Sequence, residues 1–161
     1  MADGRSLRRA QNAYKTLCAM LDERSWNYDR EEDKLKILCG AQGEDLPIAI
    51  DITVYPDLEL VTLLSHMPFD VPEDRRTAVS LAVSLINDSI VDGDFDYDFL
   101  TGTIVFRLTS SILESLIGKE MFEYMLDVSC ATVEEYNDKL LKVAEEDMSL
   151  EEIAKLIKGD E

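Results

Sequence analysis

The amino-acid sequence predicts an α+β fold, an antiparallel sheet of about five strands packed against helices. The clearest sign is the stretch 92–108, where aspartates alternate with aromatic residues before Thr101-Gly102 and aliphatic residues alternate with polar ones after it. This period of two is typical of a hairpin with one buried face. Three more strand patterns and four stretches of helical spacing complete the order α-β-β-β-α-β-β-α with an extra C-terminal helix.

An amphipathic helix opens the chain, because apolar residues recur every three or four positions from Leu7 to Leu21. We expect this helix to cover the sheet. Residues 26–33 form a polar connector. Strands follow at 35–41 and 46–55, and isoleucine or valine at every second position of the later strand indicates one buried face.

The third strand, predicted at 59–67, has apolar residues on both faces. Leu60 and Leu64 share one face, and the opposite face carries Val61, Leu63 and Met67. The sequence leaves open which set points away from the helices. Because the outward set would be an uncovered apolar surface, we take Leu60 and Leu64 as candidate partner-binding residues.

A second helix begins after Pro72, since proline followed by acidic residues is typical of a helix N-terminus. Residues 78–90 are apolar almost all round, which indicates burial on more than one side. The exception is a narrow stripe of small polar residues: Thr77, Ser80, Ser84 and Asn87. Small side chains let two backbones approach, and twofold pairs are the commonest oligomers, so we expect a homodimer through this stripe.

The hairpin predicts its own register, because a slip by one residue would exchange the buried and exposed faces. If Leu100 pairs with Thr103, the facing pairs are Phe99 with Ile104, Tyr97 with Phe106, and Phe95 with Leu108. One face is then wholly apolar, and the other carries three aspartates with Arg107 opposite Asp96. We expect Phe106 in the core and Arg107 at the surface.

The C-terminal part is helical. One long helix is predicted over 122–143, and Ser149 with Glu152 forms a capping-box pattern that opens a terminal helix. The apolar residues of this helix are candidates for partner binding: Leu150, Ile153, Leu156 and Ile157. The alternative is that the helix packs on its own domain. We expect a single domain over 1–161, with a core at 5–145 and the terminal helix at 149–159.

The chain of 161 residues is strongly acidic, because 16 Lys and Arg stand against 34 Asp and Glu, a net charge of −18. This charge repels nucleic-acid phosphates, and no basic cluster offsets it, so we expect no nucleic-acid partner. We find neither a signal peptide nor an apolar run long enough to span a bilayer in the sequence, which predicts a cytoplasmic protein without membrane contact.

Motifs for metal binding or catalysis are not found in the sequence. The aspartates of 92–98 lie along a strand and lack the glycine and glutamate of a calcium loop. The three cysteines are far apart and predict reduced, buried thiols. No Ser or Cys partner can be placed beside the side chain of His66, the only histidine, from the sequence. We therefore expect no cofactor, no metal ion and no catalytic residue.

Motifs in the second helix and the hairpin resemble those of the YbjN family. They are V-P-E-D-R-R at the start of the helix, Asn87 near its end, and G-D-F-D-Y-D-x-x-x-G-x-I-x-F-R in the hairpin. The resemblance covers about residues 5–145 and implies a bacterial protein with the fold of type III secretion chaperones, which are small acidic dimers that bind another protein. The family has been described as a sensory transduction regulator, and it offers no catalytic residue to transfer to this sequence.

The leading hypothesis is a non-enzymatic protein-interaction module, chaperone-like or regulatory, that binds an extended or helical segment of a partner protein. It rests on the lack of a catalytic motif, the acidity, the resemblance and the apolar residues of the third strand and terminal helix. The alternative is a small carboxylate-based hydrolase or ligand-binding enzyme whose site forms only in three dimensions. Such a site would be a deep pocket with perturbed carboxyl groups.

Overall fold

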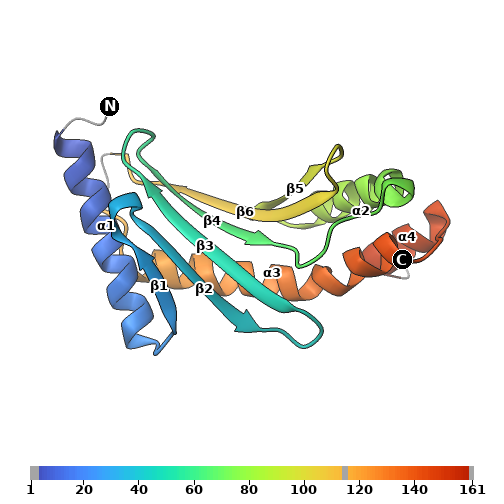
Figure 1. Ribbon diagram of the computed structural model, residues 1–161, viewed down its shortest axis with the longest axis horizontal. Helices are drawn as coiled ribbons and strands as arrows, with labels where there is room; N and C mark the ends of the chain where they lie inside the picture. The colour runs from blue at the N-terminus through green and yellow to red at the C-terminus, as the bar shows by residue number, and fades with distance from the viewer. Residues whose placement is uncertain (1–3, 114–115, 160–161) are drawn as a thin grey trace.

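In the computed structural model, which describes residues 4–113 and 116–159, a six-stranded antiparallel sheet packs against helices (Figure 1). The strands lie in the order β1-β2-β3-β4-β6-β5. Their bounds are β1 (Tyr28–Glu31), β2 (Lys36–Gln42), β3 (Pro47–Tyr55), β4 (Leu60–His66), β5 (Asp94–Asp98) and β6 (Thr103–Ser111). The predicted α+β class and antiparallel sheet are therefore confirmed, with six strands in place of about five.

Four α-helices cover the sheet and one of its ends: α1 (Gly4–Glu23), α2 (Arg76–Ser89), α3 (Lys119–Glu145) and α4 (Leu150–Lys158). The helix α3 runs along the sheet, with α1 near one of its ends and α2 and α4 near the other (Figure 1). Two short 3₁₀ turns, η1 (Glu32–Lys34) and η2 (Glu73–Arg75), precede β2 and α2. Among residues 4–113 and 116–159, no helix combines the length and apolar character that a membrane span requires.

The core lies between the helices and one face of the sheet. Alternate residues of the long strands point into it, including Ile48, Ile50, Ile52, Val54, Val61, Leu63, Ile104, Phe106 and Leu108. The helices contribute apolar residues at three- and four-residue spacing, such as Leu17 and Leu21 of α1 and Phe122 and Leu126 of α3. Each such side chain, when fully buried, stabilises the fold by about 1.5–3 kcal/mol, so this alternation holds the sheet to the helices.

The predicted polar connector at 26–33 is wrong in part, because Tyr28–Glu31 forms β1. This strand pairs antiparallel with β2, with Tyr28 opposite Cys39 and Glu31 opposite Lys36. Its sequence Tyr-Asp-Arg-Glu has no alternation of apolar and polar residues. The strand forms because its backbone pairs with β2. Since its side chains stay largely exposed on both faces, their polarity does not alternate along the sequence.

The predicted hairpin register is wrong by two residues. Tyr97 faces Ile104 and Phe95 faces Phe106, so the faces are as predicted but the turn is longer. The Asp98 carboxylate accepts hydrogen bonds from the backbone N–H groups of Leu100 (2.9 Å) and Thr101 (3.3 Å), which closes a turn over residues 99–102. Gly102 adopts φ +85°, and Phe99 is left half exposed in the turn.

The long helix and the terminal capping box are as predicted. The helix α3 continues without a break, and α4 begins at Ser149, whose hydroxyl accepts a hydrogen bond from Glu152 N–H. The reciprocal bond runs from Ser149 N–H to the Glu152 carboxylate at 2.8 Å, and it lowers the pKa of that carboxyl group. The cap thus satisfies backbone donors that would otherwise lack partners at the start of α4.

Candidate interaction surface

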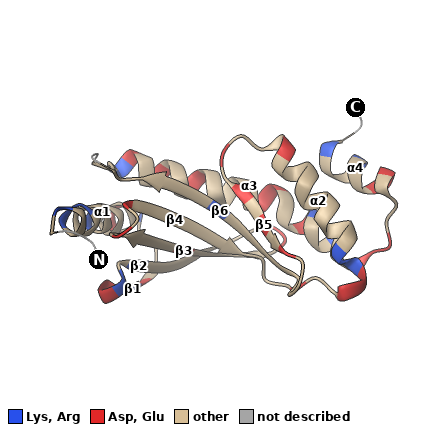
Figure 2. Cartoon of the chain, turned by 90° about the horizontal axis from the view of Figure 1, so that it is seen from above, with Lys and Arg blue, Asp and Glu red and all other residues tan. Residues whose placement is uncertain are grey.

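One face of the sheet is left uncovered by the helices. Side chains of β3, β4, β5, β6 and the β3–β4 turn form a shallow groove of about 630 Å³ on it. We call this the outer sheet surface, and it is lined by Tyr55, Leu58, Leu60, Thr62, Leu64, His66, Asp96, Val105, Arg107 and Thr109. In Figure 2, β3 and β4 are drawn almost wholly in tan, whereas acidic residues gather on helices and loops. Tan marks every uncharged residue, and the apolar part of the surface comes from Tyr55, Leu58, Leu60, Leu64 and Val105.

The pairing of the strands places Leu60 and Leu64 on the outward side of β4, within the outer sheet surface. Leu64 lies between Asp51 of β3 and Arg107 of β6, and Leu60 pairs with Tyr55. Val61 and Leu63 are buried on the opposite face, so the structure answers which set points outward. Both candidate residues from β4 therefore lie on the outward face and are half buried.

Sequence reasoning missed three further apolar members of this surface: Tyr55, Leu58 and Val105. Tyr55 and Leu58 are 38% and 66% exposed, and Val105 lies opposite His66. Tyr55 falls on the polar side of the alternation in β3 and Val105 on the polar side in β6. The signal that was missed is a large apolar residue at an outward position of a strand. Such residues form one surface only when their strands are neighbours, and the strand order is not known from the sequence.

Charged residues flank Leu64 and line the margin of the surface, and most of them are paired. The guanidinium of Arg107 contacts the carboxylates of Asp94 (3.4 Å) and Asp96 (3.0 Å), and Lys36 forms an ion pair with Asp51. Partial burial raises the pKa of Asp96 against the opposing effect of Arg107. Since two cations oppose at least three carboxylates here, the margin is acidic, as is the whole chain.

The terminal helix takes one of the two placements that the sequence left open. Ile153 and Ile157 are buried in the domain core, where α4 packs chiefly against α2, and Leu156 is half buried. Burial of the two isoleucines contradicts their assignment to an exposed docking surface and supports the alternative, that the helix packs on its own domain. Leu150 is 69% exposed at the start of α4 and lies apart from the outer sheet surface.

The stripe predicted as a dimer interface lies on α2. Thr77 and Ser84 are exposed, whereas Ser80 is half buried and donates a hydrogen bond to the Arg76 carbonyl at 2.9 Å. Asn87 is engaged with β5, as described below. The helices α3 and α4 and the strand β5 pack around α2, which accounts for its apolar character within one chain. The homodimer stays a prediction.

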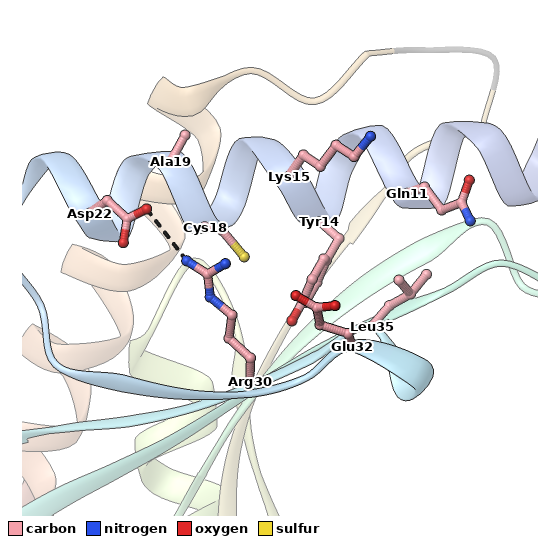
Figure 3. Close-up of a pocket in the computed structure, with 9 residues that line it drawn as sticks. All are labelled: Gln11, Tyr14, Lys15, Cys18, Ala19, Asp22, Arg30, Glu32 and Leu35. Carbon is pink, nitrogen blue, oxygen red and sulfur yellow. Dashed lines mark hydrogen bonds and ion pairs between the residues drawn. The ribbon is translucent and has the colours of Figure 1, made fainter.

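A second cavity, of about 590 Å³, lies between α1 and the segment β1–η1 (Figure 3). Arg30 rises from β1 toward α1 and reaches Asp22, and its guanidinium lies 5.1 Å from the centre of the Tyr28 ring. Tyr28 O–H donates to the same Asp22 carboxylate at 2.7 Å. Burial raises the pKa of Cys18 and, to about 12, that of Tyr14.

These groups do not form a reactive centre. A thiol becomes a nucleophile by losing its proton, and a raised pKa keeps Cys18 protonated at neutral pH. The cavity is lined by two cationic side chains, Lys15 and Arg30, and two anionic ones, Asp22 and Glu32, and Arg30 forms an ion pair with Asp22. The contacts around the cavity therefore hold α1 to the edge of the sheet, and we assign the cavity no catalytic role.

Metal-binding and redox chemistry find no support in the described part of the chain. Within it no three or more His, Cys, Asp or Glu side chains converge on a point where they could hold a metal ion. All three cysteines are free, and burial raises the pKa of Cys39 to about 12 and of Cys130 to about 11. His66 is exposed at the end of β4, within the outer sheet surface.

Comparison with known proteins relates the chain to one family. Residues 13–142 match the family model of YbjN, described as a "putative bacterial sensory transduction regulator". The crystal structure of YbjN from E. coli, described as a "putative transcription regulator", superposes with a TM-score of 0.58 at 15% sequence identity and covers 77% of this chain and 90% of that one. A search of the curated proteins finds no match. The family match spans most of the sequence and the shared fold agrees with it, so the chain belongs to the YbjN family.

Proposed function

We propose that this chain is a cytoplasmic, non-enzymatic regulator that acts by binding a segment of another protein on the outer sheet surface. The observation that carries the proposal is the sheet itself: helices cover one face, and the other carries half-buried Leu60, Leu64 and Val105 together with exposed Tyr55 and Leu58. Contiguous exposed apolar areas of this kind mark interaction sites on proteins. The description of the family as a regulator is consistent with this role.

Charge complementarity indicates the chemistry of the partner. The chain carries a net charge of −18, so a second copy on the outer sheet surface would bring two strongly like-charged molecules together. A basic segment would be attracted instead. On a surface that combines apolar side chains with a net acidic charge, the apolar contacts set the dissociation rate of a partner and the charge raises its association rate.

The enzymatic alternative has one feature in its favour, the raised pKa of Asp96 beside Asp94. General acid catalysis needs a carboxyl group of this kind in a site that excludes water. Asp96 instead lies on an open surface, and Arg107 forms ion pairs with both carboxylates. These contacts support the interpretation that Asp96 contributes to the charge of the surface and does not transfer protons.

The test is affinity capture from native bacterial cytosol with three forms of the protein: wild type, Leu64→Asp and Leu150→Asp. Leu150→Asp is a matched control, because Leu150 is exposed and lies outside the outer sheet surface. We expect a stoichiometric protein that Leu64→Asp loses and Leu150→Asp retains. Equal capture by all three forms would contradict the proposal, because the partner would then bind elsewhere. A circular dichroism melt of each variant checks that it is folded.

A further inference from the structure

Extended segments of a partner can join a sheet only along a free edge. In this sheet the edge strand β5 is occupied from within the chain: Phe95 N–H donates to Asn87 Oδ1 at 2.8 Å, and Asn87 Nδ2 donates to the Phe95 carbonyl at 3.0 Å. The side chain of Asn87 thus occupies the backbone N–H and C=O of Phe95, two of the groups that an added strand would use. The other edge strand, β1, is only four residues long and carries Asp29 and Arg30 at its centre. Short, charged edges are poor templates for strand addition.

A segment that docks on the face of the sheet meets side chains and not backbone. The backbone groups of β4, at the centre of the outer sheet surface, are paired on both sides, with β3 and with β6. A docked segment that excludes water must therefore satisfy its own N–H and C=O groups, which an α-helix does and an isolated extended segment does not. We infer that the partner segment, if the proposed function holds, is a basic amphipathic α-helix lying across the outer sheet surface.

The dimensions of the surface fit such a helix. Leu60 and His66 lie at opposite ends of β4, six residues apart, which spans about 20 Å at about 3.4 Å per residue. A helix rises about 1.5 Å per residue, so about 13 residues cover this length. The apolar side chains would meet one apolar stripe along this length, since Leu60 lies at one end of β4, Leu64 in its second half, and Val105 opposite His66 at the other end. Lysine or arginine beside that stripe would reach Asp94 and Asp96 at the margin.

The helix test uses synthetic probes of about 14 residues, measured by fluorescence anisotropy at low salt. The first is a leucine–lysine sequence with apolar residues at helical spacing. The second has the same composition with two central prolines, which prevent a helix. The third carries glutamate in place of lysine. We expect the first probe to bind at least about tenfold more tightly than either of the others and to gain helical circular dichroism when bound.

Protein variants show whether binding uses the proposed surface. We expect Leu64→Asp to weaken binding of the first probe at least about tenfold, and Asp96→Asn to weaken it about threefold at low salt, whereas Leu150→Asp leaves it unchanged. Leu60→Asp replaces Leu64→Asp should the latter not fold. No preference for the helical probe, or no effect of either leucine variant, would overturn the inference.

Failure of this inference is distinguishable from failure of the proposed function. If the proline probe binds as well as the helical probe and Leu64→Asp weakens both, the surface binds protein segments but does not require a helix. The inference then fails and the proposed function stands. If Leu64→Asp changes neither probe binding nor capture from cytosol, both fail, because the outer sheet surface is then not the binding site.

Discussion

Asn87 makes two hydrogen bonds that hold the edge of the sheet to α2. Its side-chain amide accepts from Phe95 N–H at 2.8 Å and donates to the Phe95 carbonyl at 3.0 Å. Phe95 is itself buried and packs against Phe106 with ring centres 5.2 Å apart. We predict that Asn87→Ala destabilises the protein because it leaves both backbone groups of a partly buried edge without these partners.

The expected loss follows from the two bonds. Each intramolecular hydrogen bond contributes about 0.5–1.5 kcal/mol net, so two contribute about 1–3 kcal/mol. Alanine forms helix more readily than asparagine, which returns about 0.5 kcal/mol near the end of α2. The net loss is about 1.5 kcal/mol in the free energy of unfolding. For a chain of 161 residues this lowers the melting temperature by about 3–6 °C.

A second substitution separates the two bonds. Asn87→Asp keeps an acceptor for Phe95 N–H but places a carboxylate against the Phe95 carbonyl, so at pH 7 it should destabilise the protein at least as much as Asn87→Ala. Protonation restores a donor, which means that the pKa of the new carboxyl group is higher in the folded state than in the unfolded state. Stability relative to wild type should then recover as the pH is lowered toward about 4.

The assay is urea unfolding of the three forms, followed by circular dichroism. Ser84→Ala is the matched control, because Ser84 is exposed on the same helix. A loss below about 0.5 kcal/mol for Asn87→Ala would refute the reasoning, since the amide would then be replaceable by water.

Four further predictions follow from the same contacts. Phe106→Ala should cost about 3–5 kcal/mol in urea unfolding and Arg107→Ala under about 1 kcal/mol, because Phe106 is fully buried and the Arg107 side chain is 45% exposed; equal losses would mean that the faces are misassigned. Backbone N–H groups lower the pKa of Asp98 below its unfolded value, so its stabilisation is present above about pH 4 and lost as the pH falls through the folded pKa. The free energy of unfolding of Asp98→Asn should therefore fall less steeply with decreasing pH below about pH 4 than that of wild type. Native Cys39 and Cys130 should react with iodoacetamide at least about a hundredfold more slowly than in urea, because burial raises their pKa, and rapid labelling would contradict this. Light scattering tests the homodimer: a mass of twice 18.2 kDa that Ser84→Arg reduces would support it, and a mass of 18.2 kDa for wild type would exclude it at that concentration.

The candidate site could be predicted only in part. Leu60 and Leu64 were found because their spacing of four residues in a strand puts them on one face. Ile153 and Ile157 carried the same apolar signal, yet they are buried against the domain. An apolar stripe on a helix has the same pattern whether it covers its own core or a partner, and the sequence does not distinguish the two.

The sequence by itself determined the faces of the elements, because side-chain polarity repeats with the period of the backbone. The alternation from Ile48 to Val54 and the capping box at Ser149 depend only on neighbours in the chain, and both are present in the structure. The tertiary structure decided the hairpin register, where Asp98 caps a longer turn, and the existence of β1, whose backbone pairs with β2. It also decided which leucines remain exposed. These features depend on residues distant in the chain or on backbone hydrogen bonds, and neither leaves a periodic pattern in side-chain polarity.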